Sequence, residues 1–289
     1  MNWEKATSPD FAAARESCGG VCLLPMGVLE KHGTHLPLGT DGLSAHELCV
    51  RAATCESAMV FPEYYFGSIV EARQHPGTVA LPFALILELL EAVCDEISRN
   101  GFKKIILVNA HGGNTSLLDA LSLTMLKKQK DYMVYYRRIA FLMDHPMMES
   151  RQKWHGHADE GETSIMMELF PELVRDCGVP GAFGFHHHQL QRLEELGVNT
   201  PVTWTAGFPG HLCGDATPGS PEKGKVLLEQ TLDNLVALIR WVKTHDDAER
   251  IYQKFHAAAQ NPQPGFGEEA SRDSLKILAM GPVREPNYT

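Results

Sequence analysis

The stretch that decides the fold reads KIILVN at residues 104–109 and continues as AHGGNT at residues 110–115. The first six residues form a continuous apolar run, which is typical of a parallel strand covered on both faces. Residues 116–127 follow with apolar side chains at helical spacing. The sequence therefore predicts a buried strand, a short polar loop and a helix, the repeating unit of an α/β fold.

The same alternation extends outward from this unit. An apolar run at residues 21–25 predicts another buried strand, and Asn100-Gly101 is a typical helix end. Strand and helix signals alternate through the first 170 residues, which predicts a three-layer α/β/α sandwich with a mostly parallel central sheet. The expected strands are residues 21–25, 60–66, 104–109 and 131–140, and the expected helices are residues 44–57, 82–100, 116–127, 160–169 and 221–243.

Length and composition favour one large globular domain. The chain has 289 residues, of which 44% are hydrophobic, enough to bury a full core. We expect a single domain over residues 1–260 and a tail rich in Gly, Pro and charge over residues 261–289. The net charge of −10 and the lack of Lys or Arg runs argue against a nucleic-acid partner.

The cysteines and the apolar segments indicate a cytoplasmic protein. Seven cysteines are scattered without a C-x-x-C pair, so we interpret them as buried, reduced thiols. The N-terminus lacks an apolar run of signal-peptide length, and no stretch is long enough to span a membrane. We therefore expect neither export nor membrane insertion.

Polar side chains follow two of the predicted strands. Glu30, His32, His35 and Asp41 come after the strand at residues 21–25, and His111 follows the strand at residues 104–109. Ligands of α/β proteins bind beyond the carboxyl ends of the strands, so the two loops are expected to converge. Imidazole and carboxylate together suit zinc, iron, nickel or manganese. Asp41 can bridge two ions, although spacing alone leaves one ion or two open.

Two further polar segments have alternative interpretations. Residues 154–164 (WHGHADEGETS) can be interpreted as a helix cap. The N-terminus of the same helix, beside His157, could also bind an anionic intermediate. Both interpretations can hold together. The triplet His186-His187-His188 precedes an exposed helix pattern. For this triplet we favour a solvated loop over a metal site.

Three motifs resemble one known family. Residues 24–41 (LPMGVLEKHGTHLPLGTD) are similar to the creatininase signature P-x-G-S-x-E-Q-H-G-x-H-L-P-L-x-T-D. Residues 109–114 (NAHGGN) resemble N-G-H-G-G-N, and residues 157–164 (HADEGETS) resemble H-A-G-E-x-E-T-S. Weaker similarities lie at residues 66–68, 75–78, 214–217 and 222–224. The chain is identified as a member of the creatininase family.

The resemblance implies roles for individual residues. Four positions match metal ligands of the family, with Asp41 as the bridging ligand, and His157 matches a proton shuttle between the activated water and the leaving nitrogen. Creatininase itself has Glu where this chain has Gly113, which puts creatinine hydrolysis in doubt. The implied metal ligands are Glu30, His32, Asp41 and His111, with Glu160 or Glu162 to complete the second site.

The resemblance also implies a substrate class. Water activated by two divalent ions (zinc, manganese or iron) would attack a carbonyl carbon of a small cyclic amide, formamide or related C–N substrate, in a homohexamer. Glu160 is a further catalytic candidate, and Ser68, Gly112 and Trp154 are substrate-binding candidates. Trp154 is as readily explained by packing as by an aromatic wall for the substrate. The alternatives are a hydrolase of a cyclic sugar derivative or a peptide, and a non-catalytic protein that binds a small molecule or metal.

Overall fold

The computed structural model describes residues 1–137, 146–149, 155–175 and 183–263. No helix in these residues is long and apolar enough to cross a membrane. The elements in chain order are η1 (Trp3–Lys5), α1 (Ser8–Ser17), β1 (Val21–Met26), α2 (Thr40–Cys55), β2 (Met59–Val60), η2 (Val70–Ala72), α3 (Phe83–Arg99), β3 (Lys104–Asn109), η3 (Gly112–Asn114), α4 (Thr115–Lys127), β4 (Met133–Tyr136), α5 (Glu160–Leu169), η4 (Pro171–Leu173), β5 (Phe183–Gly184), α6 (Gln191–Glu195), α7 (Thr203–Gly207), β6 (Gly214–Asp215), α8 (Pro221–Thr244) and α9 (Asp247–Gln260).

The central sheet has four parallel strands in the order β2-β1-β3-β4. β1 and β3 pair in register from Val21 with Lys104 to Met26 with Asn109, so their carboxyl ends lie side by side. Every residue of β1 is buried, and in β3 only Lys104 is partly exposed. Burial on both faces is the reason that these strands are continuous apolar runs.

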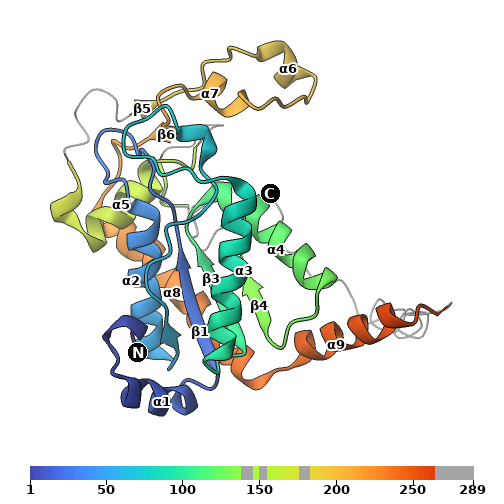
Figure 1. Cartoon of the computed structure of the whole chain (residues 1–289). Helices are drawn as coiled ribbons and strands as arrows, with labels where there is room; N and C mark the ends of the chain where they lie inside the picture. The colour runs from blue at the N-terminus through green and yellow to red at the C-terminus, as the bar shows by residue number, and fades with distance from the viewer. Residues whose placement is uncertain (138–145, 150–154, 176–182, 264–289) are drawn as a thin grey trace, which may run out of the picture. The chain divides into compact units, whose positions relative to one another are not determined.

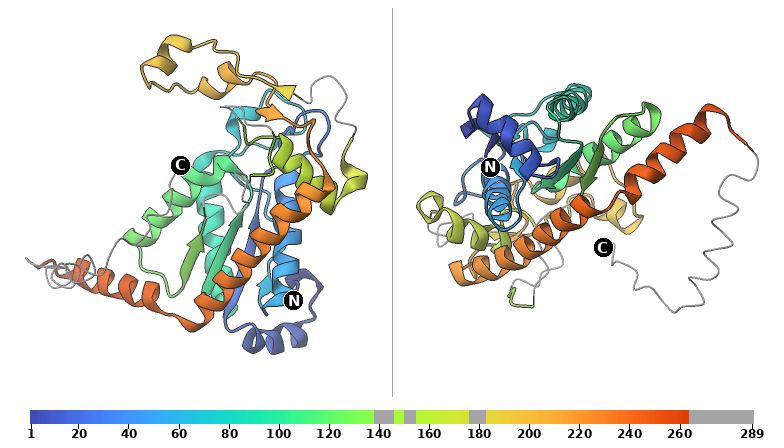
Figure 2. Two further views of the ribbon diagram at one scale, coloured as in Figure 1. Left: turned by 180° about the vertical axis from the view of Figure 1, so that it is seen from behind. Right: turned by 90° about the horizontal axis from the view of Figure 1, so that it is seen from below.

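Helices cover both faces of this sheet (Figures 1 and 2). On one face Leu23 and Ile106 pack in a single cluster with Leu48 of α2 and Ile239 of α8. Successive side chains of a strand point to opposite faces, so Leu24 points to the other face, which α3 and α4 cover. The predicted α/β/α arrangement with a parallel sheet is confirmed.

Three element boundaries differ from the prediction. The strand expected at residues 60–66 is reduced to β2, because regular pairing ends after the Phe61 N–H donates to Leu23; Tyr64 then donates to Pro25 and forms only an isolated bridge to Met26. α2 begins at Thr40 instead of residue 44, which brings Asp41 into its first turn. The strand expected at residues 131–140 is β4, and residues 138–140 lie outside the described residues.

A second, two-stranded sheet positions the loops over the main one. β5 and β6 pair antiparallel, and beside them His157 and Cys213 form a bridge in which the Cys213 N–H donates to the His157 carbonyl over 3.0 Å. Gly214 has a φ of 121°, and a Cβ there would lie 2.7 Å from the Cβ of Asp159. Glycine therefore allows the chain around residue 213 to lie against the loop that carries His157.

The C-terminal helix α9 belongs to a separate unit. Contacts divide the chain into a unit of residues 1–245 and a second unit that begins at Asp246. The sequence analysis did not predict α9, whose first turn contains Asp247 and Glu249. The expected domain over residues 1–260 and tail over residues 261–289 stay predictions, and residues 264–289 lie outside the described residues.

Candidate metal centre

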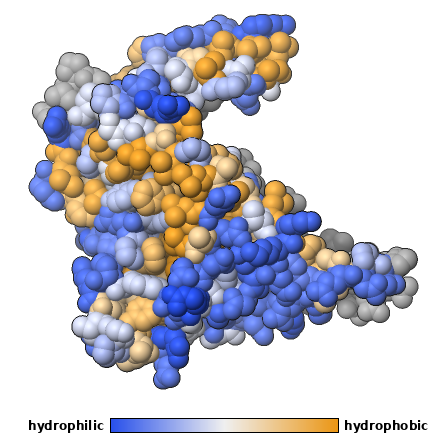
Figure 3. Space-filling view, viewed as in Figure 1, coloured by the Kyte–Doolittle hydropathy of each residue, from blue (hydrophilic) through white to orange (hydrophobic). Residues whose placement is uncertain are grey.

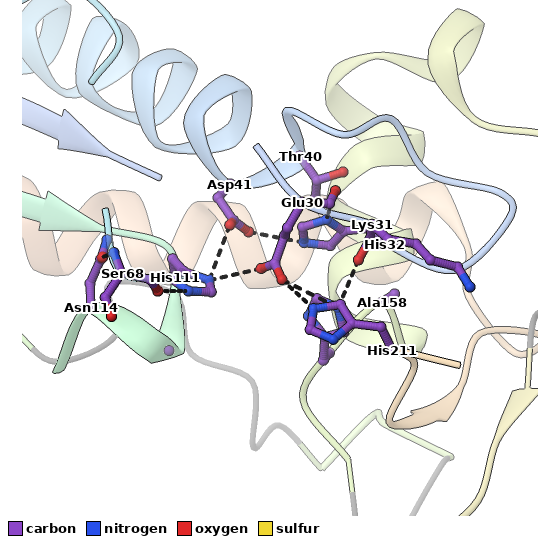
Figure 4. Close-up of polar contacts among 12 residues, drawn as sticks. Glu30, Lys31, His32, Thr40, Asp41, Ser68, His111, Asn114, Ala158 and His211 are labelled. Atoms are coloured by element: carbon purple, nitrogen blue, oxygen red, sulfur yellow. Dashed lines mark hydrogen bonds and ion pairs between the residues drawn. The ribbon is translucent and has the colours of Figure 1, made fainter. Parts of the chain in front are cut away.

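Polar side chains gather beyond the carboxyl ends of β1 and β3 (Figure 4). Glu30 and His32 lie in the loop after β1, Asp41 lies in the first turn of α2, and His111 lies between β3 and η3. At most 6% of each residue is exposed. Charged groups are buried at this depth only when they are paired or bind a cation. The structure thus brings together the four side chains that the sequence motifs single out.

Asp41 is the centre of this group. Its Oδ1 lies 3.1 Å from Nε2 of His32, and its Oδ2 lies 3.3 Å from Nδ1 of His111. On the other side of His111, Nδ1 lies 2.9 Å from Oε1 of Glu30. The two oxygens of Asp41 therefore face two different sets of ligand atoms, which is the arrangement of a bridging carboxylate.

Each histidine presents one nitrogen to the carboxylates and is held by the other nitrogen. Nδ1 of His32 donates to the backbone carbonyl of Glu30 over 3.3 Å. Nε2 of His111 donates to the carbonyl of Ser68 over 2.9 Å, and the Ser68 N–H donates to the side chain of Asn114. Backbone acceptors of this kind fix the tautomer and orientation of metal-binding imidazoles.

The carboxylates and imidazoles shift one another's pKa. Burial alone would lower the pKa of His32, but the carboxylate of Asp41 outweighs burial and raises it to about 10. Burial opposes the charged form of His111 as well, yet Glu30 and Asp41 raise its pKa well above the ordinary value. Protons on the imidazoles therefore balance the carboxylates without a cation, and a divalent ion would bind by releasing those protons.

Glu162, in the first turn of α5, adds a third carboxylate. Its Oε2 lies 3.6 Å from Nε2 of His32 and accepts the Ala158 N–H over 2.6 Å. Burial, with repulsion from Asp41, raises the pKa of Glu162 to about 8. A cation beside Glu162 would favour the ionised carboxylate and so offset the free-energy cost of burying its charge.

Two groups of donor atoms share Asp41, and a third group joins Glu30, His32 and His157. Glu30, Asp41 and His111 have ligand atoms within 4.8 Å of one another, and so do His32, Asp41 and Glu162. Oε1 of Glu30 and Oδ2 of Asp41 are buried and have no donor other than Nδ1 of His111, whose proton a bound cation would displace. Buried carboxylate oxygens with so few donors are costly unless a cation binds them, so the residues present fit divalent metal ions.

Glu160 lies in a different set of contacts. Its Oε1 accepts from Nζ of Lys223 over 2.6 Å, and both oxygens accept the backbone N–H of Glu149. It is absent from every group of metal-ligand atoms in the described residues. Of the two carboxylates that the sequence left open, the structure brings only Glu162 to the cluster.

The three substrate-binding candidates have different surroundings. Ser68 contacts the site through its backbone, which holds His111. Gly112 is exposed at the start of η3, directly after His111. Trp154 lies outside the described residues.

His157 lies beside the two groups. Its Nε2 donates to the carbonyl of Lys31 over 3.0 Å and lies 3.9 Å from Oε2 of Glu30. The ring centroid is 4.6 Å from that of His32. Burial lowers the pKa of His157 to about 3, so this imidazole is neutral at pH 7.

His211 is a site residue that the sequence analysis missed. It lies 1% exposed in the loop before β6, and its Nε2 contacts Oε2 of Glu30 (Figure 4). The chain carries it 181 positions away from Glu30, and no motif contains it. The only sequence signal is a lone His after Pro209-Gly210.

The histidine triplet lies in loop 185–190. His186, His188 and Glu194 have ligand atoms within 4.8 Å of one another. Nδ1 of His186, however, accepts the backbone N–H of His188 over 3.1 Å, and Nε2 points to Glu194 over 3.7 Å. These contacts link the histidines to one another and to Glu194, and the preference for a solvated loop over a metal site stays a prediction.

His35, in the same loop as Glu30, makes stability depend on pH. It is 1% exposed, its Nε2 contacts Oγ1 of Thr163 over 2.8 Å, and burial lowers its pKa to about 4. Because the unfolded chain binds the proton more tightly, stability is lost as the pH falls from about 6.5 to about 4. When the pH falls from 7 to 5, protonation of this residue should lower the free energy of unfolding by about 2 kcal/mol.

Denaturant unfolding at pH 7 and pH 5 measures this loss. H35Q keeps a polar contact for Thr163 without a titrating group, so its loss between the two pH values should be smaller than that of the wild type by this amount. Equal losses in both proteins would contradict the prediction.

Gly113 is explained by its distance from His111. A Cβ at this position would lie 2.4 Å from Nε2 of His111 and 2.7 Å from the carbonyl oxygen of Ser68, the two atoms that form the orienting hydrogen bond. The glutamate of creatininase therefore does not fit this arrangement. Oε1 of Glu71 would lie 3.2 Å from a Cβ at position 113.

G113A is expected to weaken metal binding. The added methyl group would push His111 off its carbonyl acceptor, and loss of such an orienting contact costs about 10- to 100-fold in metal affinity. Cobalt titration of the metal-free protein measures the effect. G210A is the matched control, since nothing lies within 4 Å of a Cβ there; equal affinity in both variants would refute the explanation.

Comparison with known proteins gives the family. The family model for creatinine amidohydrolase matches residues 4–239. The chain is 26% identical over 248 residues to the creatinine amidohydrolase of Pseudomonas putida, which covers 78% of this chain and 92% of that protein. It is 25% identical over 289 residues to the 3-dehydro-scyllo-inosose hydrolase of Thermotoga maritima, with 91% and 87% covered.

Solved structures share the fold. A mutant creatininase complexed with creatine has a TM-score of 0.69 at 22% identity and covers 83% of this chain and 97% of its own. A manganese form of creatininase has a TM-score of 0.65 at 23% identity, with the same 83% and 97% covered. Since the family match spans most of the chain and these structures share its fold, the chain belongs to the creatininase family of hydrolases.

Proposed function

We propose that this hydrolase binds two divalent ions, zinc, manganese or iron, and cleaves a C–N bond of a small cyclic amide, formamide or related substrate. The observation that carries the proposal is Asp41, whose two oxygens face two donor groups. Manganese and zinc forms of creatininase among the similar structures support the choice of metals. The named relatives act on creatinine, an inosose derivative or a precursor peptide, which leaves the substrate to experiment.

The proposed ligands divide between the two ions. Glu30 and His111 would hold one ion, His32 and Glu162 would hold the other, and Asp41 would bind both. Bound ions of this kind lower the pKa of water and polarise a carbonyl group. The residues themselves supply a buried, oriented set of oxygens and nitrogens that keeps bulk water away from the reaction.

His157 is the proposed proton carrier. Its hydrogen bond to the Lys31 carbonyl uses the proton on Nε2, which leaves Nδ1 as the basic nitrogen. This imidazole would accept a proton from the attacking water and return it to the leaving nitrogen. One C–O bond forms at the carbonyl carbon and one C–N bond breaks, so the reaction needs no other reagent than water.

Metal analysis combined with a substrate screen tests the proposal. We expect about two ions per chain, and activity toward a cyclic amide or a formamide that a chelator removes and added zinc, manganese or iron restores. Turnover of only sugar lactones would contradict cleavage of a C–N bond, and turnover of only peptides would contradict a small substrate. A chain that binds no ion at millimolar zinc and manganese would contradict the metal-dependent function and favour a binding protein.

We also propose that the protein forms a homo-oligomer, and from the resemblance a hexamer, through an arm formed by residues 183–207. Apolar side chains of this arm are exposed (Figure 3), including Phe185 at 58% and Val202 at 55%. Exposed apolar clusters of this kind mark protein interfaces. Light scattering should show V202D as a smaller species than the wild type and L123D, which changes an exposed leucine of α4. A monomeric wild type would contradict this.

The cysteines support a reducing compartment, and we propose the cytoplasm. Cys18, Cys22, Cys49, Cys94 and Cys213 are free and buried as expected, whereas Cys55 is free but exposed, so the expectation of burial is wrong for that residue. Burial among apolar side chains keeps thiols inert and reduced. Cys177 lies outside the described residues.

A further inference from the structure

His211 has a backbone conformation that is uncommon for residues other than glycine. Its φ is 53°, in the left-handed region, which costs a residue with a Cβ more than it costs glycine. The strain persists only if contacts of the side chain compensate for it. The contacts of the His211 imidazole are therefore expected to explain this conformation.

The hydrogen bonds of His211 determine its tautomer. Nε1–H of Trp204 donates to Nδ1 of His211 over 2.8 Å. An indole nitrogen can only donate, so Nδ1 is an acceptor and the ring proton is on Nε2. That proton points to Oε2 of Glu30. The three side chains form a directed chain of donors from Trp204 to the carboxylate.

Aromatic rings enclose His211 and hold its orientation. Its centroid lies 4.6 Å from that of His157, 5.5 Å from that of His75 and 5.6 Å from that of Trp204. With 1% exposure, the ring has little freedom to turn. The donor to Glu30 is thus held rigidly by residues of other loops.

The contact with His211 uses one of the two carboxylate oxygens of Glu30. Oε2 is occupied by His211, while Oε1 is buried and has no donor other than Nδ1 of His111, 2.9 Å away. The carboxylate cannot rotate without breaking the contact with His211. Glu30 therefore presents a single oxygen to the group that it forms with Asp41 and His111.

We propose that His211, fixed by Trp204, is a positioning residue that holds Glu30 as a one-oxygen ligand of the ion bound by Glu30, Asp41 and His111. The inference rests on the proposed metal-dependent function. It accounts for the backbone conformation of His211, and it preorganises the donor group of Glu30, Asp41 and His111. Orienting partners of this kind contribute about 10- to 100-fold to metal affinity.

A matched pair of variants isolates the hydrogen bond. H211Q and H211L carry the same backbone strain and similar length, but only glutamine offers an N–H near the position of Nε2. Cobalt absorption during titration of the metal-free full chain should show two binding events in the wild type. In H211L one of the two events should lose about 10- to 100-fold in affinity while the other event stays unchanged. H211Q should recover most of this loss, and W204F, which keeps an aromatic ring but removes the donor, should fall between them.

Four results would overturn the inference. H211L that binds both ions as tightly as the wild type, or H211Q that loses as much affinity as H211L, would refute the role of the N–H donor while leaving the proposed function intact. Equal weakening of both ions, with a lower melting temperature of the metal-free variant, would indicate a merely structural role. A wild type that binds no cobalt would overturn the proposed function together with the inference.

Discussion

D41N is expected to abolish binding of both metal ions and to lower kcat/KM by about 10³-fold or more. Oδ1 and Oδ2 of Asp41 face His32 and His111 at 3.1 Å and 3.3 Å, so this side chain is the only member common to both donor groups. An amide replaces one anionic oxygen by an NH₂ group, which repels a cation. Elemental analysis of the purified variant and steady-state kinetics measure the two effects.

D233N is the matched control for D41N. Asp233 is exposed on α8, so the same chemical change there should alter neither metal content nor turnover. Circular dichroism of both variants should show an intact fold. A D41N protein that retains a full complement of ions would refute the bridging role.

H157N should lower kcat by about 10²- to 10⁴-fold, the range for loss of a general acid or base, while leaving the metal content unchanged. The reason is that His157 lies next to Glu30 and donates to the Lys31 carbonyl, outside the two donor groups that share Asp41. Metal analysis and kinetics on the same preparation separate binding from proton transfer.

The same experiment has a clear contrary result. Ligand atoms of Glu30, His32 and His157 also lie within 4.8 Å of one another. Loss of an ion in H157N would therefore show that His157 is a ligand and would contradict its role as proton carrier. H187N changes an exposed histidine and should leave both measurements unchanged.

The central fold was predictable because local signals and tertiary structure agree. β3 matches its predicted residues, and α3 ends where Asn100 and Gly101 terminate it. β2 was not predictable in length, because regular pairing with β1 ends after Val60 although Tyr64 still forms a bridge to Met26. The start of α2 at Thr40 was missed, since the motif around it has no helical apolar pattern.

The site was predictable where strand ends determine position. Parallel pairing places the loops after β1 and β3 at one edge, so Glu30 and His111 converge. The choice between Glu160 and Glu162 could not be predicted from the sequence. Two residues apart on a helix differ by about 200° in direction, and only packing of α5 decides that Glu160 points to Lys223 and Glu162 to His32.

The sequence by itself determined the family, the α/β architecture and four of the metal-ligand candidates, because continuous motifs carry all of them. Only the tertiary structure decided the contacts between distant loops. His211 reaches Glu30 because the pairing of residue 157 with residue 213 brings its loop over the site. The need for glycine at position 113 likewise follows from the orientation of His111. Such contacts depend on where a loop lies in space, which no local pattern of residues encodes.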